Sequence, residues 1–176
     1  MKYSADPSIL QQEDDAQVAW GAIEPFWEDL PLGNARQLLA FMSDLTRGQR
    51  GLIAVDWCQK EIRNGGIEQL FLNPTGDLVP WAIEGFQMIG ARRYAEILSE
   101  AASALGPEYP VSVVERTTIC EALKPSHWQR IEDLEDAFFA LINSPEHDLE
   151  RYRGGFVRQN PQEFVKDATA IDRKGS

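Results

Sequence analysis

The sequence predicts an all-α protein built as a single compact multi-helix domain. Apolar residues recur at helical spacing along most of the chain, Gly and Pro clusters separate these stretches, and only one short run is rich in β-branched residues. The length of 176 residues suits one domain, and apolar and aromatic shares of 43% and 10% argue against disorder. We expect one domain over residues 1–176, with flexible ends at 1–12 and 170–176.

Three helices are expected before residue 65. Apolar side chains from Ala19 to Leu30 keep helical spacing, and Pro25 should kink or break that stretch. Asn34 should cap a helix over 35–45. A third helix should run over 46–64, where Gly65 should close it in the left-handed conformation.

The next elements are short helices separated by turn residues. A helical turn is expected over 67–72, and Asp77 should cap a helix that ends at Met88. An Ala-rich helix over 91–105 should end at Gly106 and Pro107. The β-branched run over 111–123 suits a strand, but a lone strand has no pairing partner in this sequence, so we expect a helix there.

The C-terminal third is predicted to hold one long amphipathic helix and two shorter ones. Ser126 should cap a helix over 127–142, whose apolar stripe contains Ile131, Leu134, Phe138 and Leu141. Glu132, Asp133 and Asp136 should point away from that stripe. Shorter helical pieces are expected over 145–158 and 161–168.

The charge balance restricts the partners. The chain has 17 Lys and Arg against 28 Asp and Glu, which gives a net charge of −11. Nucleic acid and anionic membranes would be repelled, so we expect neither as a direct partner and expect basic partners instead. No apolar run suits a membrane helix and no leader pattern is present, which favours a cytoplasmic location.

Motifs that carry enzyme chemistry are absent from the sequence. It contains no nucleotide-binding glycine motif, no hydrolase serine motif and no zinc-protease motif. Cys58 and Cys120 are 62 positions apart and are expected to be reduced, buried thiols. We expect no catalytic residues, metal or cofactor, although an enzyme that uses paired carboxylates stays open as a minor alternative.

Two segments contain acids and no Lys or Arg. Residues 3–35 hold seven acids and residues 131–150 hold seven more, which together are half of the 28. Glu24 with Glu28, and Glu132 with Asp136, would be like-charge pairs four residues apart, and such pairs destabilise a helix. Function is one explanation for them, and an ordinary acidic surface that favours solubility is the other.

A comparison with duplex DNA shows how the acids would have to be arranged if the protein surface were to imitate the charge of a duplex. Twice the net charge of −11, for a dimer, matches only about 37 Å of duplex at one charge per 1.7 Å. Two globules of this size would span roughly 60–70 Å. Mimicry would therefore require acids gathered on one surface, and the two acid-only segments are consistent with such segregation.

The stretch from Glu61 to Gly76 resembles the signature of a bacterial DNA-mimic protein family long filed as a domain of unknown function. The matching residues are Asn64, Gly65, Gly66, Gln69, Phe71, Asn73 and Gly76, while Ile67 and Leu70 replace residues that are usually aromatic. Further similarity extends the resemblance over about residues 56–164. As residue types, the glycines suit positive φ at helix ends, and the amides suit bonds to freed backbone groups.

The resemblance implies an acidic all-α protein, a homodimer, that keeps a DNA-binding protein off its operator. Our leading hypothesis is that carboxylates replace phosphates in contacts with a basic DNA-binding protein, such as a transcription regulator. The candidate residues are Glu24, Glu28, Asp29, Glu132, Asp133, Asp136, Glu146, Asp148 and Glu150. The alternative is an interaction or immunity-type module that binds through apolar contacts, with Trp20 and Trp27 as candidates.

Overall fold

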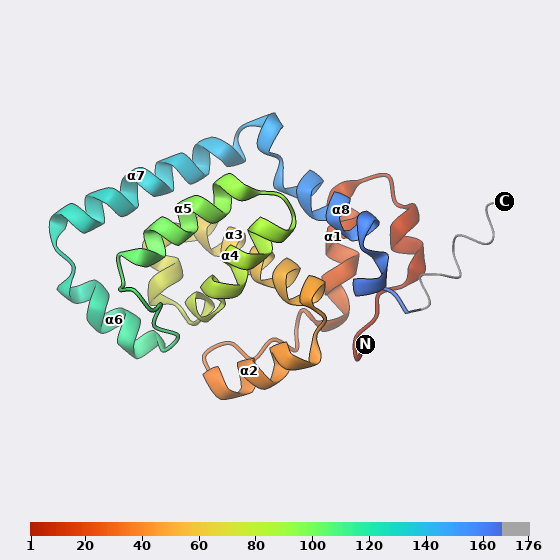
Figure 1. Cartoon of the computed structure of the whole chain (residues 1–176), viewed down its shortest axis with the longest axis horizontal. Coiled ribbons are helices and arrows are strands. Elements are labelled where there is room, and N and C mark those ends of the chain that lie inside the picture. Colours follow the sequence, from red (N-terminus) through yellow and green to blue (C-terminus); the bar gives the residue numbers. More distant parts are fainter. Residues whose placement is uncertain (167–176) are drawn as a thin grey trace.

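A computed structural model describes residues 1–166, and no strand occurs among them (Figure 1). The all-α prediction is confirmed. The α-helices of this part of the chain are α1 (Asp15–Ile23), α2 (Ala35–Asp44), α3 (Arg47–Leu72), α4 (Val79–Met88), α5 (Arg92–Ser103), α6 (Val113–Ala122), α7 (Pro125–Ile142) and α8 (Leu149–Gln159). Short 3-10 helices η1 to η5 cover Pro7–Gln11, Glu24–Phe26, Pro74–Leu78, Pro145–His147 and Pro161–Glu163.

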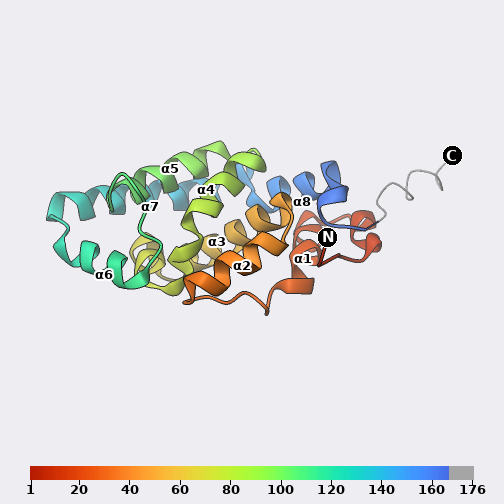
Figure 2. The same ribbon diagram turned by 60° about the horizontal axis from the view of Figure 1, so that its bottom comes forward.

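The long helix α3 runs through the middle of the molecule, and the other helices pack around it. Helices α4, α6, α7 and α1 contact α3 directly, α5 packs on α4 and α7, and α8 packs on α1 (Figures 1 and 2). Gly51 of α3 faces Gly85 of α4, where a Cβ on Gly85 would lie 2.5 Å from the Gly51 carbonyl oxygen. The absence of side chains there lets the two backbones approach closely.

Two predicted helix starts are confirmed by their capping bonds. The Asn34 side chain accepts from the Gln37 N–H at the start of α2. Thr46 and Gln49 form a reciprocal capping box at the start of α3, because each side chain accepts from the other residue's backbone N–H. Both caps join residues only three positions apart; the sequence predicted Asn34 as a cap, and for α3 it predicted the start but not the capping role of Thr46.

The predicted break near Pro25 is confirmed, and it corrects one further inference. Helix α1 ends at Ile23, and Pro25 lies inside the 3-10 helix η2. Glu24 and Glu28 are therefore not paired on one continuous α-helix, so the like-charge helix argument fails for them. It holds for Glu132 and Asp136, which lie within α7.

Two predicted caps are wrong. Asp77 does not cap α4, because it belongs to η3 and its carboxylate binds the buried Arg116 instead. Ser126 does not cap α7, which begins one residue earlier at Pro125 and has no side-chain cap bond. In the first case a tertiary partner, which the local sequence could not show, takes the side chain.

The ambiguous run before residue 123 is a helix, as predicted. Thr117 and Thr118 donate their hydroxyl protons to the carbonyls of Val113 and Val114, one turn back in α6. The helix buries Arg116 and Cys120 and leaves Val114 exposed. Cys58 and Cys120 are both buried free thiols, as expected.

The N-terminal segment contacts the C-terminal part of the described chain. The Ala5 N–H donates to the Phe164 carbonyl at 2.9 Å, and Ile9 is buried against the core. Flexibility of residues 1–12 stays a prediction. Segment 170–176, and the end of the helical piece predicted over 161–168, lie outside the described residues. Over residues 1–166, no helix combines the length and the apolar character that a membrane span requires.

Candidate functional site

The glycine pair of the signature makes a kink inside α3. Of the two glycines that suit positive φ, Gly66 adopts it, with φ +82 and ψ −178, while Gly65, expected to close the helix, has φ −157. The Ile67 N–H, freed by the kink, donates to Glu135 of α7 at 2.7 Å. A side chain on Gly66 would overlap that carboxylate, and one on Gly65 would overlap the Gln69 amide. The kink thus requires glycine at both positions.

Glu61 collects the amide side chains of the signature. Its Oε1 accepts from the Gln69 amide at 2.7 Å and from the Asn73 amide at 2.5 Å, and its Oε2 accepts from the Thr75 hydroxyl at 3.0 Å. These bonds hold the segment after the kink against the helix before it. Bonds to freed backbone groups were predicted for Gln69 and Asn73, and this prediction is wrong, because both amides bind a carboxylate side chain.

Arg116 closes the other side of the same segment. Its guanidinium donates to the carbonyls of Phe71 and Asn73 at 2.7 and 2.8 Å and pairs with Asp77 at 2.8 Å. The side chain is fully buried, so each donor that lost its acceptor would be costly. A Cβ on Gly76 would lie 2.8 Å from the Arg116 Nε, which explains the glycine there.

We call Glu61, Arg116, Glu135 and the seven signature residues the signature cluster. Sequence reasoning found the seven signature residues and missed the three charged side chains that hold them. Glu61 and Asn73 are twelve positions apart, while Glu135 and Arg116 come from other helices, so no local pattern indicates those two. Burial raises the pKa of the neighbouring Cys58 thiol and Tyr109 hydroxyl, which keeps both groups neutral near pH 7.

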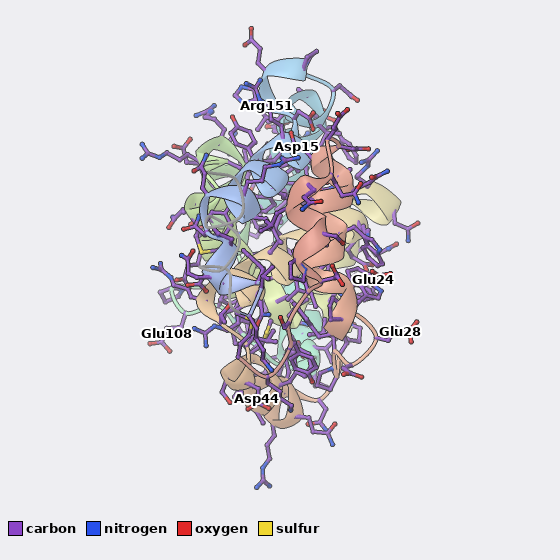
Figure 3. The ribbon with its side chains drawn as sticks, turned by 90° about the vertical axis from the view of Figure 1, so that its right-hand side faces the viewer. Asp15, Glu24, Glu28, Asp44, Glu108 and Arg151 are labelled. Atoms are coloured by element: carbon purple, nitrogen blue, oxygen red, sulfur yellow. The ribbon has the colours of Figure 1, made fainter. Side chains whose placement is uncertain are left out.

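The first acidic group contains Glu24, Glu28 and Asp29, and all three side chains are exposed. Figure 3 shows Glu24 and Glu28 on one side of the molecule and Glu108 on the opposite side. Lys60 lies over the rings of Trp20 and Trp27, 5.1 and 4.1 Å from their centroids, and its ammonium pairs with Asp56 at 2.9 Å.

The two candidate tryptophans differ in their packing. Trp27 stacks on Trp57, with ring centroids 4.4 Å apart and an interplanar angle of 7°. Trp20 touches Trp27 at its outer side and is 38% exposed. Trp27 is thus largely part of the core, and Trp20 is the one that a partner could reach.

The second acidic group lies on α7 and contains Glu132, Asp133 and Asp136. All three are exposed, while Ile131, Leu134 and Phe138 of the same helix are buried, as the predicted stripe requires. Leu141, the fourth member of the stripe, is half-buried against the core. Asp133 accepts only a long bond, 3.4 Å, from the Gln129 amide. The carboxylates of this group face solvent with little to hold them.

The third acidic group contains Glu146, Asp148 and Glu150, at the start of α8. Asp148 accepts from the Glu150 N–H and so caps α8. Glu150 is half-buried and pairs with Arg153, which in turn binds the buried Asp56 of α3. Glu150 therefore has a structural partner, and sequence reasoning missed the Arg153–Asp56 pair because its two residues are 97 positions apart.

The structure brings some of the candidate acids together and leaves others apart. Glu146 and Asp148 share the lining of a cavity of about 660 Å³ with Asp15 and Arg151. Figure 1 shows α1 in the right half of the molecule and α7 in the left half; the first acidic group follows α1 in the chain, whereas the second lies on α7. Within residues 1–166, Glu150 is the only one of the nine acids that forms an ion pair. A single continuous surface of all nine stays a prediction.

The same part of the chain offers no arrangement typical of a metal site. Among residues 1–166, no three His, Cys, Asp or Glu side chains lie close enough to hold a metal ion.

Fold and surface together define an acidic, all-helical protein with exposed carboxylates grouped on separate elements. A family model described as DMP19-like protein matches residues 43–160, two thirds of the chain, and the protein belongs to this family. Comparisons with curated proteins and with solved structures found no significant match. The matched segment contains the signature cluster and the second and third acidic groups, whereas Glu24, Glu28 and Asp29 precede it.

Proposed function

We propose that this protein is a DNA mimic, which binds the DNA-contacting surface of a basic DNA-binding protein and blocks its access to DNA. The observation that carries the proposal is the exposure of the acids in the second and third acidic groups. Five of those six carboxylates are exposed and form no ion pair within the described residues, inside a segment that matches the DMP19-like family. Carboxylates held in this way are available to a partner's Lys and Arg side chains.

Binding of this kind is electrostatic and distributed over many contacts. An exposed ion pair contributes about 0–1 kcal/mol, so no single acid should be decisive. Salt screens such contacts, with a Debye length of about 8 Å at physiological ionic strength. Affinity should therefore fall steeply as salt rises, and duplex DNA should compete for the same face of the partner.

The proposal includes a homodimer that acts in the cytoplasm and carries out no catalysis. One chain with a net charge of −11 is short of charge relative to a duplex of its own length, and a two-fold pair would extend the charged surface. Light scattering at micromolar concentration should give the mass of a dimer. A monomer mass would remove the support for a duplex-length surface.

The experiment that tests mimicry reverses the α7 group. The variant Glu132→Lys, Asp133→Lys, Asp136→Lys should lose binding to a partner captured from the native cell and eluted by a salt step. A matched control reverses three exposed acids outside the three acidic groups, Glu13→Lys, Glu68→Lys and Glu121→Lys. Both variants change the net charge equally, so only the position of the charges differs.

The outcomes separate mimicry from general charge attraction. Mimicry predicts that the α7 variant loses the partner, that the control variant keeps most of the affinity, and that DNA displaces the protein. If both variants lose binding equally, net charge and not a shaped surface is responsible. If the partner binds DNA and this protein simultaneously, mimicry is wrong.

A second candidate function is an interaction module that uses apolar contacts, and the exposure of Trp20 favours it. Trp20→Ala should then abolish partner binding while the α7 variant has no effect, and binding should be indifferent to salt. The two candidates therefore predict opposite results from the same pair of variants.

A further inference from the structure

Exposed large apolar side chains are few in this protein, and three of them line neighbouring cavities. Within residues 1–166 they are Met1, Trp20, Leu39, Val111 and Val114. Leu39 belongs to α2, Val114 to α6, and Val111 to the loop before α6. Val114 is 70% exposed, the largest value of the five.

These side chains line two cavities, one beside α6 and one beside α2. The larger cavity, about 530 Å³, is lined by Val111, Val114 and Ile119 together with Tyr109 and Pro110. Val111 also lines a smaller cavity beside Leu38, Leu39 and Trp81. The two cavities adjoin at Val111, which lines both, and we call them together the α2–α6 groove.

The fold does not explain the apolar character of this groove. Helix α6 already buries Arg116 and Cys120 on its inner side, so Val114 adds nothing to the core. A β-branched residue loses side-chain freedom in a helix and is a poor choice for an exposed helical position. Apolar side chains that neither the core nor the helix requires are typical of a contact surface.

The charge around the groove indicates the chemistry of its occupant. Glu108 and Glu115 line the larger part, and no Lys or Arg lines either part of the groove. The guanidinium of Arg116, on the same helix, is buried and engaged with Asp77. An occupant must therefore combine apolar side chains with positive charge. A second copy of this chain fits poorly, because a two-fold contact would bring the glutamates of both copies together.

We propose that the α2–α6 groove binds an amphipathic helix of a partner protein, whose apolar face fills the groove and whose basic residues flank that face beside Glu108 and Glu115. Such a helix buries its apolar stripe in the way that helix-in-groove complexes do. Figure 3 places Glu108 on the side opposite to Glu24 and Glu28, so this contact is separate from the first acidic group. The groove thus adds a second recognition surface, whether or not the carboxylates mimic DNA.

A defined peptide tests the proposal directly. The probe is a fluorescein-labelled helical peptide of Leu and Lys, with Leu repeated at helical spacing so that it forms one face. The matched control peptide has the same composition in an order that scatters Leu around the helix. Fluorescence anisotropy at physiological salt should show about tenfold tighter binding of the amphipathic peptide, since only that peptide can bury its Leu side chains.

Variants of the groove should remove that preference. Val114→Ser with Leu39→Gln should weaken the amphipathic peptide about tenfold and leave the control peptide unchanged. The double variant Glu108→Gln, Glu115→Gln should weaken it at low salt and lose its effect at high salt. The triple reversal on α7 lies outside the groove and should leave the ratio between the two peptides intact.

Three results would overturn the proposal. They are equal affinity for the two peptides, an unchanged ratio in Val114→Ser with Leu39→Gln while the far-UV helix signal is retained, and a halved solution mass in that variant. The last result would show that a second copy of this chain occupies the groove.

Discussion

The signature cluster and the acidic surface use charged side chains in opposite ways. In the cluster, Glu61, Glu135 and Arg116 have hydrogen-bond partners from other parts of the chain, and their bonds hold the kink of α3 in place. On α7, the carboxylates of Glu132 and Asp136 are exposed and form no bond within residues 1–166. The first set is fixed by the fold, and the second set is left free by it.

This difference teaches which part of a family resemblance carries information about function. The signature residues, on which the resemblance rests, are held by internal contacts, so a substitution there should weaken the fold. The α7 acids Glu132 and Asp136 should be replaceable without a change in the fold, since within residues 1–166 they are exposed and unbonded. A match to the signature thus reports the fold, and mimicry has to be tested on the acids.

Loss of Arg116 should have the largest effect on stability. In Arg116→Leu, Asp77 stays buried without its cation, and the backbone carbonyls of Phe71, Asn73, Pro110 and Val111 lose a donor. Removal of one partner of a buried ion pair costs about 3–5 kcal/mol. Urea unfolding should report this loss, whereas Arg130→Leu, which breaks an exposed pair with Glu100, should cost less than about 1 kcal/mol. Similar losses of unfolding free energy in Arg116→Leu and Arg130→Leu would contradict the distinction between the buried cluster and the exposed surface.

A side chain at the kink should have the next largest effect. Gly66→Ala forces a Cβ onto a backbone with φ +82 and against the Glu135 carboxylate, and we expect a loss of about 1–3 kcal/mol. Gly155→Ala is the matched control, because Gly155 lies within α8 and its Cβ would meet no atom within 4 Å. The control should be neutral or stabilise the protein by about 0.4–1 kcal/mol in thermal or urea unfolding.

Alkaline pH should weaken the folded protein more gradually. Burial raises the pKa of Cys58 above its ordinary value of 9.0 and that of Tyr109 above 10.0. Above those values the unfolded chain releases protons that the folded chain retains, so the stability that these groups contribute below pH 9 is lost as pH rises. Urea midpoints measured from pH 7 to pH 10 should fall. The urea midpoint of Cys58→Ala should fall less steeply above pH 9 than that of the unchanged protein. An equal slope would show that Cys58 does not contribute to the loss of stability.

Reversal of the α7 acids should have the smallest effect on stability. The variant Glu132→Lys, Asp133→Lys, Asp136→Lys changes three exposed side chains, and its unfolding free energy should stay within about 0.5 kcal/mol per substitution. Circular dichroism and urea unfolding measure this directly. A loss comparable to that of Arg116→Leu would show that these acids hold the fold and would remove the contrast between the two regions.

The sequence predicts what depends on neighbours along the chain and not what depends on distant residues. Asn34 was identified as a cap because the group it binds lies three residues away, and the start of α3 was located to within one residue. Asp77 was misassigned because its partner, Arg116, is 39 positions away on another helix. Exposure of the α7 acids followed from helical periodicity. The arrangement of the three acidic groups relative to one another depends on how α1, α7 and α8 pack, which no local pattern contains.

Competition with DNA tests mimicry most directly. A labelled operator duplex is bound to the captured partner, and this protein is titrated in at low and at physiological salt. We predict that it displaces the duplex, that the displacement weakens steeply with salt, and that the triple reversal on α7 abolishes it. A ternary complex of partner, duplex and this protein, or displacement that is unchanged by the triple reversal, would contradict the mimicry proposal.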